Sequence, residues 1–272
     1  MSAGAPSRFT TAAAAAVAGG VLASAALGAL TTHSHTVIIE PGEYQPATAE
    51  CAPGERIVSG GFESPNFEFP DGSRISVSSS LKRVRHRWSS AGLNGSPTVA
   101  GNLISYAYCE DAGLRLRTRR AETTIGAVSG ATAKCRPGEW LVSGGFTAPD
   151  IAPDESIAMV RSHKRGQGWN VAGRVTSGPD MTLVAQAYCH PEAPRLRTVS
   201  LTRPVPVDTA RSLKVACPRG LPLVAGGFVA SEPPDSMSVY RSKRAGRQRW
   251  RVSGAPTSLT TGALTVEAYC RR

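Results

Sequence analysis

The chain contains few aromatic residues and none of the short motifs that mark the common enzyme classes. Aromatic residues make up 6% of its 272 residues. It has no Gly-x-Ser-x-Gly, no His-Glu-x-x-His and no phosphate-binding loop, which argues against the hydrolases, metalloproteases and nucleotide-binding enzymes that depend on those signatures. We therefore expect no catalytic residue, no cofactor and no enzyme activity. One alternative stays open, because the paired carboxylates of a glycosidase leave no sequence motif.

Signals for helices, zinc and nucleic acid are missing as well. No window combines a sustained 3.6-residue apolar period with capping residues, whereas the 28 glycines and 20 prolines are typical of short strands joined by turns. No Cys-x-x-Cys or histidine pair lies near a cysteine, and His33 and His35 alone would make a weak metal site, so we predict no metal. Without a recognition helix, RNP or KH signature, we expect no intracellular nucleic acid partner.

The N-terminal segment differs from the rest of the chain. Arg8 is the only charged residue before Glu40, and residues 11–30 are almost entirely Ala, Gly, Val and Leu. With the small residues Ala23-Ser24-Ala25 as a cleavage site, residues 1–30 are typical of a secretory signal peptide. The alternative is an uncleaved membrane anchor, since about 20 apolar residues can span a bilayer. We favour cleavage, because alanine is only weakly apolar. In both cases the remainder is expected outside the cell.

One frame, Cys-x-x-Gly-x-x-x-Val-x-Gly-Gly-Phe, occurs three times. It begins at Cys51, Cys135 and Cys217, and each copy is followed by a tryptophan and then by Ala-Tyr-Cys. A fixed period of this kind indicates several copies of one structural unit. We therefore divide the chain into repeats 1, 2 and 3, which cover residues 31–110, 111–191 and 192–272.

The six cysteines fall two to a repeat. An even number of cysteines in an exported chain predicts a disulfide framework. Three-fold symmetry leaves two patterns, with bonds either within each repeat or between successive repeats. We favour bonds within each repeat. The predicted pairs are Cys51–Cys109, Cys135–Cys189 and Cys217–Cys270.

The repeated motif suggests how each unit packs. Val142, Gly144 and Phe146 are two residues apart, so they share one face of a strand. A glycine on a buried strand face indicates close approach by a neighbour, and we predict that the tryptophan of each repeat lies over it. The expected core residues are Phe62, Phe146, Phe228, Trp88, Trp169 and Trp250.

A Pro-Asp pair follows the motif in every repeat. We interpret these pairs as turns in which the aspartate caps backbone N–H groups. A calcium or sugar site is the alternative, although one carboxylate per loop falls short of a calcium cage. The pairs are Pro70-Asp71, Pro153-Asp154 and Pro234-Asp235.

Basic residues precede each tryptophan, at the expected tip of a hairpin. Together with the tyrosines of Ala-Tyr-Cys, which we place on the outer face of the last strand, they are the candidate ligand contacts. The formal net charge of +11 is consistent with attraction to a polyanion. The candidates are Lys82, Arg83, Lys164, Arg165, Lys243, Arg244, Tyr108, Tyr188 and Tyr269.

The frame ending in Ala-Tyr-Cys resembles repeats in exported actinobacterial proteins of unknown function, over nearly all of residues 49–272. Three β repeats with paired cysteines are also loosely similar to the vitelline membrane outer layer protein, a resemblance that implies a β-prism. We expect an all-β, β-prism-like body with pseudo-three-fold symmetry, in which each repeat gives a sheet of four or five strands. The alternative is three small β modules in a row.

Two function classes are consistent with these features. The first is an exported, non-catalytic binding protein that engages a cell-wall polyanion or glycan through its basic hairpin tips. The second is a structural or protein-interaction component of the envelope with no small ligand. A membrane contact is expected only through residues 11–30, if they are not cleaved.

Overall fold

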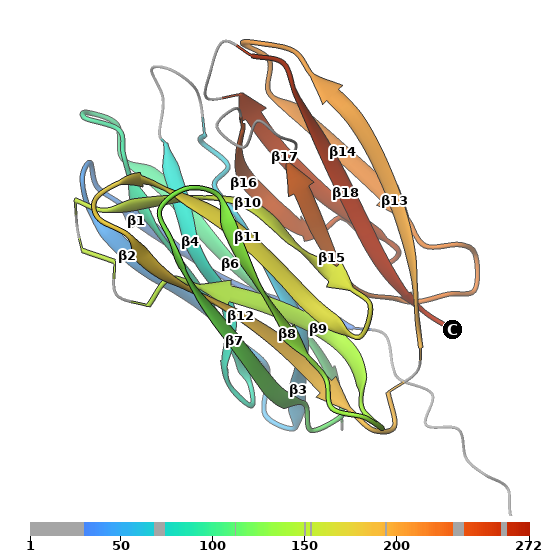
Figure 1. The fold of residues 1–272 in the computed structure, drawn as a ribbon. Helices are drawn as coiled ribbons and strands as arrows, with labels where there is room; N and C mark the ends of the chain where they lie inside the picture. The colour runs from blue at the N-terminus through green and yellow to red at the C-terminus, as the bar shows by residue number, and fades with distance from the viewer. Residues whose placement is uncertain are drawn as a thin grey trace, which may run out of the picture.

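The computed structural model describes residues 30–67, 74–111, 113–149, 151–152, 154–193, 195–230, 237–256 and 260–272. Within these residues the fold is all-β, with eighteen strands and no helix (Figure 1). The all-β prediction is therefore confirmed. The proposed leader lies outside the described residues, as do the predicted turns at Pro70-Asp71 and Pro234-Asp235 and the proline of the pair at residue 153. In the described part of the chain, no helix has the length and apolarity needed to cross a membrane.

Each repeat supplies six strands. Repeat 1 forms β1 (Thr31–Ile39), β2 (Tyr44–Glu50), β3 (Glu55–Glu63), β4 (Ile75–Val84), β5 (Arg87–Asn94) and β6 (Gly101–Asp111). Repeat 2 forms β7 (Arg117–Ile125), β8 (Ser129–Lys134), β9 (Trp140–Thr147), β10 (Ser156–Arg165), β11 (Gly168–Ser177) and β12 (Met181–His190). Repeat 3 forms β13 (Leu196–Val205), β14 (Arg211–Ala216), β15 (Leu223–Ala230), β16 (Met237–Arg244), β17 (Arg249–Pro256) and β18 (Gly262–Arg271).

The three sheets do not coincide with the three repeats. Each sheet has six strands, in the orders β1-β6-β3-β16-β17-β14, β2-β5-β4-β9-β12-β7 and β13-β18-β15-β10-β11-β8. Every sheet thus joins three strands of one repeat to three strands of another. The prediction of one four- or five-stranded sheet per repeat is wrong. A repeat on its own would leave β3 and β4 as open edges, and pairing with a neighbouring repeat covers both.

The joints between repeats are short and equivalent. Each consists of two residue pairs: β3 pairs with β16, β4 with β9, and β10 with β15. Because the first repeat pairs with the last, the three repeats form a closed ring compatible with a β-prism. This closure rules out three separate modules in a row.

The second glycine of each motif permits these joints. A Cβ atom built on Gly61 would lie 2.3 Å from the backbone oxygen of Ser242 in β16. Gly145 and Gly227 face the backbone oxygens of Ser80 and Ser162 in the same way, at 2.5 and 2.6 Å. Any side chain at these positions would push the neighbouring repeat away.

The first glycine of each motif receives a tryptophan, as predicted. A Cβ atom on Gly60 or Gly226 would lie 2.2 Å from the indole ring of Trp88 or Trp250, respectively. The indole N–H groups are satisfied, because each tryptophan donates to a serine hydroxyl on the adjacent hairpin strand at 2.9–3.1 Å.

The three motif phenylalanines meet in the interior. The ring of Phe62 lies edge-on to the rings of Phe146 and Phe228, with centroids 6.2 and 6.3 Å apart. All three are at most 2% exposed, as are Trp88, Trp169 and Trp250. The predicted core is therefore confirmed, with one phenylalanine and one tryptophan from every repeat.

All six cysteines form disulfides within their own repeats: Cys51–Cys109, Cys135–Cys189 and Cys217–Cys270. This is the pairing that we favoured from the sequence. Three disulfides and no free cysteine are typical of a protein that folds in an oxidising environment outside the cytoplasm.

Candidate anion-binding surface

The strand directions bring all three hairpin tips to one end of the body. In repeat 1, β1 runs away from this end and β2 returns to it, and the alternation continues through β6. The β4–β5 tip therefore lies beside the turn after Cys51 and the link into repeat 2, where Cys51 N donates to His86 O at 2.8 Å. Leu116, in the link before β7, and Leu196, the first residue of β13, line one cavity here with the motif valines Val58, Val142 and Val224. We call this the basic end.

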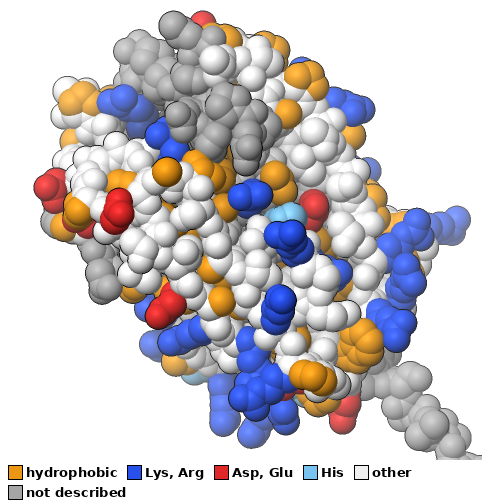
Figure 2. Space-filling model, viewed as in Figure 1, with side chains coloured by type: hydrophobic (Ala, Val, Ile, Leu, Met, Phe, Trp, Pro, Cys, Tyr) orange, Lys and Arg blue, Asp and Glu red, His pale blue; other side chains and the backbone are white. Residues whose placement is uncertain are grey.

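Charge is distributed unevenly along the body. Figure 2 shows Lys and Arg side chains grouped along the lower and right-hand margins of the visible face, on the side where the C-terminus lies in Figure 1. The exposed cations of the hairpin tips are Arg83, Arg85, Arg87, Arg165, Arg247 and Arg249. Exposed acids lie in loops at the opposite end, namely Glu40, Glu43, Asp154, Asp180 and Asp208. Glu50, Asp111 and Glu192 are exposed at the basic end, where Glu50 pairs with Arg87 at 3.1 Å. The exposed arginines of the tips outnumber these three acids. The basic end is thus a surface for attracting anions.

The axial cavity at the basic end is not itself a ligand site. Its volume is about 10 Å³, roughly the space that one water occupies. Glu110 and Arg271 border it, with carboxylate and guanidinium 3.6 Å apart. Burial raises the pKa of Glu110, and the charge of Arg271 partly opposes this. Anion binding must therefore use the surface around the axis.

The tyrosines that we placed on an outer face are buried, so this part of the predicted ligand surface is wrong. Tyr108, Tyr188 and Tyr269 are at most 1% exposed. Each hydroxyl accepts a hydrogen bond at 2.7 Å from a backbone N–H in the hairpin of another repeat. Burial raises the pKa of each phenol. The tyrosines are structural, because they fasten one repeat to the next.

The donors of these hydrogen bonds identify equivalent cations in the three hairpins. Lys82 N bonds to Tyr188, Lys164 N to Tyr269 and Arg244 N to Tyr108. The strand register supports the same equivalence, because each of these cationic residues lies opposite the tryptophan of its own repeat in the hairpin. Arg244, rather than Lys243, is therefore the counterpart of the two lysines.

The candidate cations divide into exposed and engaged groups. Arg83 and Arg165 are exposed, whereas the other four are partly buried. Lys243 forms an ion pair with Glu63 and donates to Tyr106 Oη at 2.9 Å. Arg244 donates to the backbone oxygens of Leu30 and Arg247. Lys243 and Arg244 are therefore occupied by contacts within the protein.

Around Lys243 lies an ion-pair network that the sequence analysis missed. Glu63 accepts from Tyr106 Oη at 2.6 Å and pairs with Arg241 at 2.5 Å. The pKa of Glu63 is lowered overall: burial opposes the shift, and the hydrogen bonds and nearby cations outweigh it. Thr147 and Val229 follow the other motif phenylalanines. The repeat pattern therefore offered no signal for this acid.

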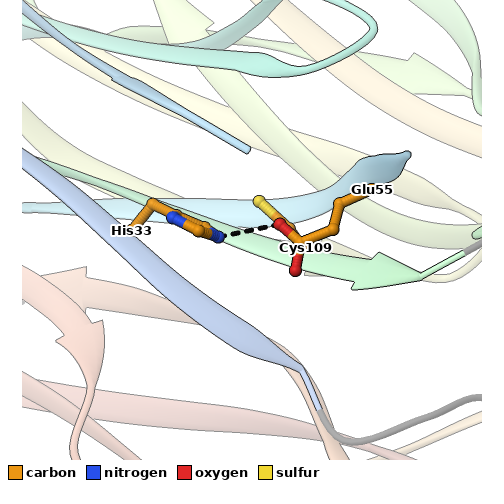
Figure 3. A group of neighbouring side chains, drawn as sticks. All are labelled: His33, Glu55 and Cys109. Atoms are coloured by element: carbon orange, nitrogen blue, oxygen red, sulfur yellow. Dashed lines mark hydrogen bonds and ion pairs between the residues drawn. The ribbon is translucent and has the colours of Figure 1, made fainter. Parts of the chain in front are cut away.

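His33 forms a hydrogen bond with Glu55 in the structure. Its Nε2 lies 2.8 Å from Glu55 Oε2, and Cys109 is adjacent (Figure 3). These three side chains bring potential metal ligands together, but the sulfur of Cys109 is bonded to Cys51. A disulfide sulfur is not a thiolate ligand, which leaves one imidazole and one carboxylate. The geometry thus does not make a metal centre of His33.

The same turn position in repeat 2 holds an acid bound by arginines. Glu139 Oε1 accepts from Arg119 at 2.5 Å and from Arg117 at 3.1 Å, and Glu139 Oε2 accepts from Arg136 N at 3.2 Å. The hydrogen bond from Arg119, aided by those from Arg136 and Arg117, lowers the pKa of Glu139 to about 2 against the opposing effect of burial. Arg117 and Arg119 are thus both engaged by this acid, whose single negative charge offsets one of their two positive charges.

The geometry leaves exposed arginines around the tips, with buried tyrosines and tryptophans behind them. Comparison with known proteins adds no functional residue to this picture. No protein-family model and no curated protein sequence matches the chain.

Proposed function

We propose that this protein is an exported, non-catalytic binding protein that engages an anionic polymer through its basic end. The observation that carries the proposal is the convergence of three arginine-bearing hairpin tips around the axis, at an end where exposed arginines outnumber exposed acids. Such a distribution attracts a polyanion and orients it before contact.

The chemistry of the tips favours polymers with repeated phosphate or acidic sugar groups. Arg83, Arg165 and Arg247 come one from each repeat. Guanidinium groups bind phosphate and carboxylate oxygens through paired hydrogen bonds, and several such contacts on one polymer add through multivalency. An envelope polyanion such as wall teichoic acid, or an acidic glycan, fits the predicted secretory leader and the three disulfides.

Cosedimentation with purified bacterial cell walls tests the proposal. We expect binding at low ionic strength that weakens steeply as salt is raised, because exposed charges are screened beyond about 8–10 Å near physiological ionic strength. The triple variant Arg83→Glu, Arg165→Glu and Arg247→Glu should abolish it.

A matched control separates the basic end from total charge. Arg120, Arg203 and Lys214 are exposed on strands β7, β13 and β14, and changing all three to Glu alters the net charge by the same amount. We expect this control to retain most of the binding. Equal losses in both triple variants, or binding that is insensitive to salt, would contradict the proposal and favour a structural or protein-interaction role.

A further inference from the structure

Lys82 differs from Lys164, its counterpart in repeat 2, in having no carboxylate near its ammonium group in the described residues. Its Nζ donates to Leu116 O at 3.2 Å and lies 5.5 Å from the centroid of the Tyr188 ring. Burial alone lowers the pKa of Lys82, whereas the charge of Glu267 partly offsets the same effect at Lys164. A partly buried cation without a counter-ion is costly, and a bound anion would relieve that cost.

Lys82 borders a cavity of about 80 Å³ at the basic end. This is several times the space that one water needs. Three arginines line the same cavity, and no acid does so among the described residues. The lining residues are Arg56, Ile57, Lys82, Arg85, Leu114, Arg115 and Leu116.

The cations around this cavity keep donors available for a ligand. Arg56 uses one guanidinium nitrogen to donate to Gly113 O at 2.6 Å, which orients its side chain. Arg85 and Arg115 are exposed, and within the described part of the chain neither forms an ion pair. Four cations around one small cavity match a group that carries two or more oxygens and a full negative charge.

The equivalent position in repeat 2 is built differently. Trp140 is the counterpart of Arg56. Arg56 pairs with Glu110, the residue after Cys109, and Trp140 pairs in the same way with His190, the residue after Cys189. The guanidinium of Arg195 lies 4.6 Å from the centroid of the Trp140 ring. The counterpart of Arg115 is therefore held on an aromatic ring, and Lys164 provides an internal control for Lys82.

We propose that the cavity lined by Arg56, Lys82, Arg85 and Arg115 is a binding site for a phosphate group. This inference rests on the proposed function and assigns part of it to one site in repeat 1. The phosphate is either a free ion or part of a polymer that continues over the exposed arginines. Lys82 supplies a fixed, partly desolvated charge, and the arginines supply paired hydrogen bonds.

Calorimetric titration with inorganic phosphate tests the site directly. We expect saturable binding by the wild-type protein, and at least a tenfold weaker affinity for Lys82→Met, which keeps the length of the side chain. Lys214→Met removes the same charge from an exposed residue on β14, outside the cavity, and Lys164→Met removes it from the equivalent position in repeat 2. Both controls should change the affinity by less than twofold.

A second measurement needs no variant and avoids any effect on folding. The wild-type protein is acylated with a limiting amine reagent, with and without phosphate, and the lysine-containing peptides are quantified by mass spectrometry. We expect phosphate to protect Lys82 and to leave Lys164 unchanged. Equal protection of both lysines, no saturable phosphate binding, or equal weakening by Lys82→Met and Lys214→Met would each overturn the site.

Linear polyphosphate distinguishes the two sources of phosphate. If the site holds one group of a polymer, polyphosphate binds more tightly per phosphate than the free ion, and Lys82→Met weakens both. If the site serves the free ion, polyphosphate binds no more tightly per phosphate group than free phosphate does. The cell-wall assay remains independent, because salt-sensitive wall binding that Lys82→Met leaves intact would overturn this site and keep the proposed function.

Discussion

The indole ring of Trp169 lies directly over Gly144, so that a Cβ atom on this glycine would be 2.1 Å from the ring. The two residues belong to the same repeat but to different sheets, because β9 and β11 are in separate sheets. This contact therefore ties together the two halves of repeat 2. The other two repeats contain the same contact.

Replacing Gly144 should destabilise the protein strongly. Gly144→Val places a branched side chain where the indole ring now lies, and overpacking of this kind costs about 1–3 kcal/mol or more. Urea unfolding followed by tryptophan fluorescence measures the change. Gly95→Ala is the control, because its Cβ would make only an ordinary contact at 3.7 Å with Arg74 O. Equal stability of Gly144→Val and Gly95→Ala would contradict the placement of the Trp169 ring over Gly144.

The Tyr188 hydroxyl should contribute to stability across the joint between repeats 1 and 2. Tyr188→Phe leaves the N–H of Lys82 without its acceptor and Gln186 Oε1 without the donor at 3.0 Å. Losing a partner for a buried polar group costs about 1–3 kcal/mol. Tyr44→Phe removes a hydroxyl that accepts one longer hydrogen bond, from the Ser78 hydroxyl at 3.2 Å. It should lower the unfolding free energy by less than Tyr188→Phe does. Both free energies come from denaturant unfolding.

Acid should remove the contribution of Glu139 to stability. Its pKa is depressed to about 2 in the folded protein from an ordinary value of 4.5. The folded state therefore gains stability from the ionised carboxylate above about pH 4.5 and loses it as the pH falls toward 2. In Glu139→Gln, the dependence of unfolding free energy on pH between these values should be shallower than in the wild type.

A second glutamate variant separates this effect from general acid sensitivity. Glu122 is exposed on β7 and forms no ion pair in the described residues. Glu122→Gln should leave the wild-type slope between pH 4.5 and 2 in place. The assignment to Glu139 fails if the two variants give the same profile.

Each disulfide should contribute substantially to stability. Cys135 and Cys189 are 54 residues apart, and closing a loop of this length contributes about 4 kcal/mol in the chain-entropy model. The double variant Cys135→Ala and Cys189→Ala should show a correspondingly lower unfolding free energy. Non-reducing peptide mapping of the wild type checks the pairing, and a Cys109–Cys135 peptide would contradict it.

The shared sheets predict a single unfolding transition for the whole body. Each repeat contributes half of each of two sheets, so one repeat cannot unfold without exposing the edges of both neighbours. Calorimetry should give one cooperative transition in the oxidised protein. Three separate transitions would mean that the repeats are independent.

The sequence predicted contacts within a repeat better than it predicted how the strands of different repeats pair into sheets. The spacing of Gly144 and Trp169 predicted their contact, because both follow from strand alternation within one repeat. The exchange of β4 and β5 into a neighbouring sheet left no such signal, since all three repeats carry equivalent strands and any copy could pair with any other.

The candidate site was predicted in part. The basic tips were visible as charge clusters, and Arg83 and Arg165 are indeed exposed. Alternation alone placed Tyr188 on an outer face, but the hairpin of another repeat covers that face and buries the ring. The cavity beside Lys82 depends on contacts between a hairpin, a turn and an inter-repeat link. Such contacts are set by the three-dimensional arrangement and have no sequence signature.

The pairing of β3 with β16 fixes how many copies of the unit this architecture can hold. In an open solenoid a repeat can be gained or lost at either end, whereas here the strand edges that join neighbouring repeats are already paired with one another, which leaves no joint for a fourth copy. Because the three repeats form a ring, the chain could also begin and end between a different pair of repeats. Leu30 and Arg271 line the same cavity, so a short linker between residues 30 and 272, with a new break between β12 and β13, should give a circular permutant with the same fold.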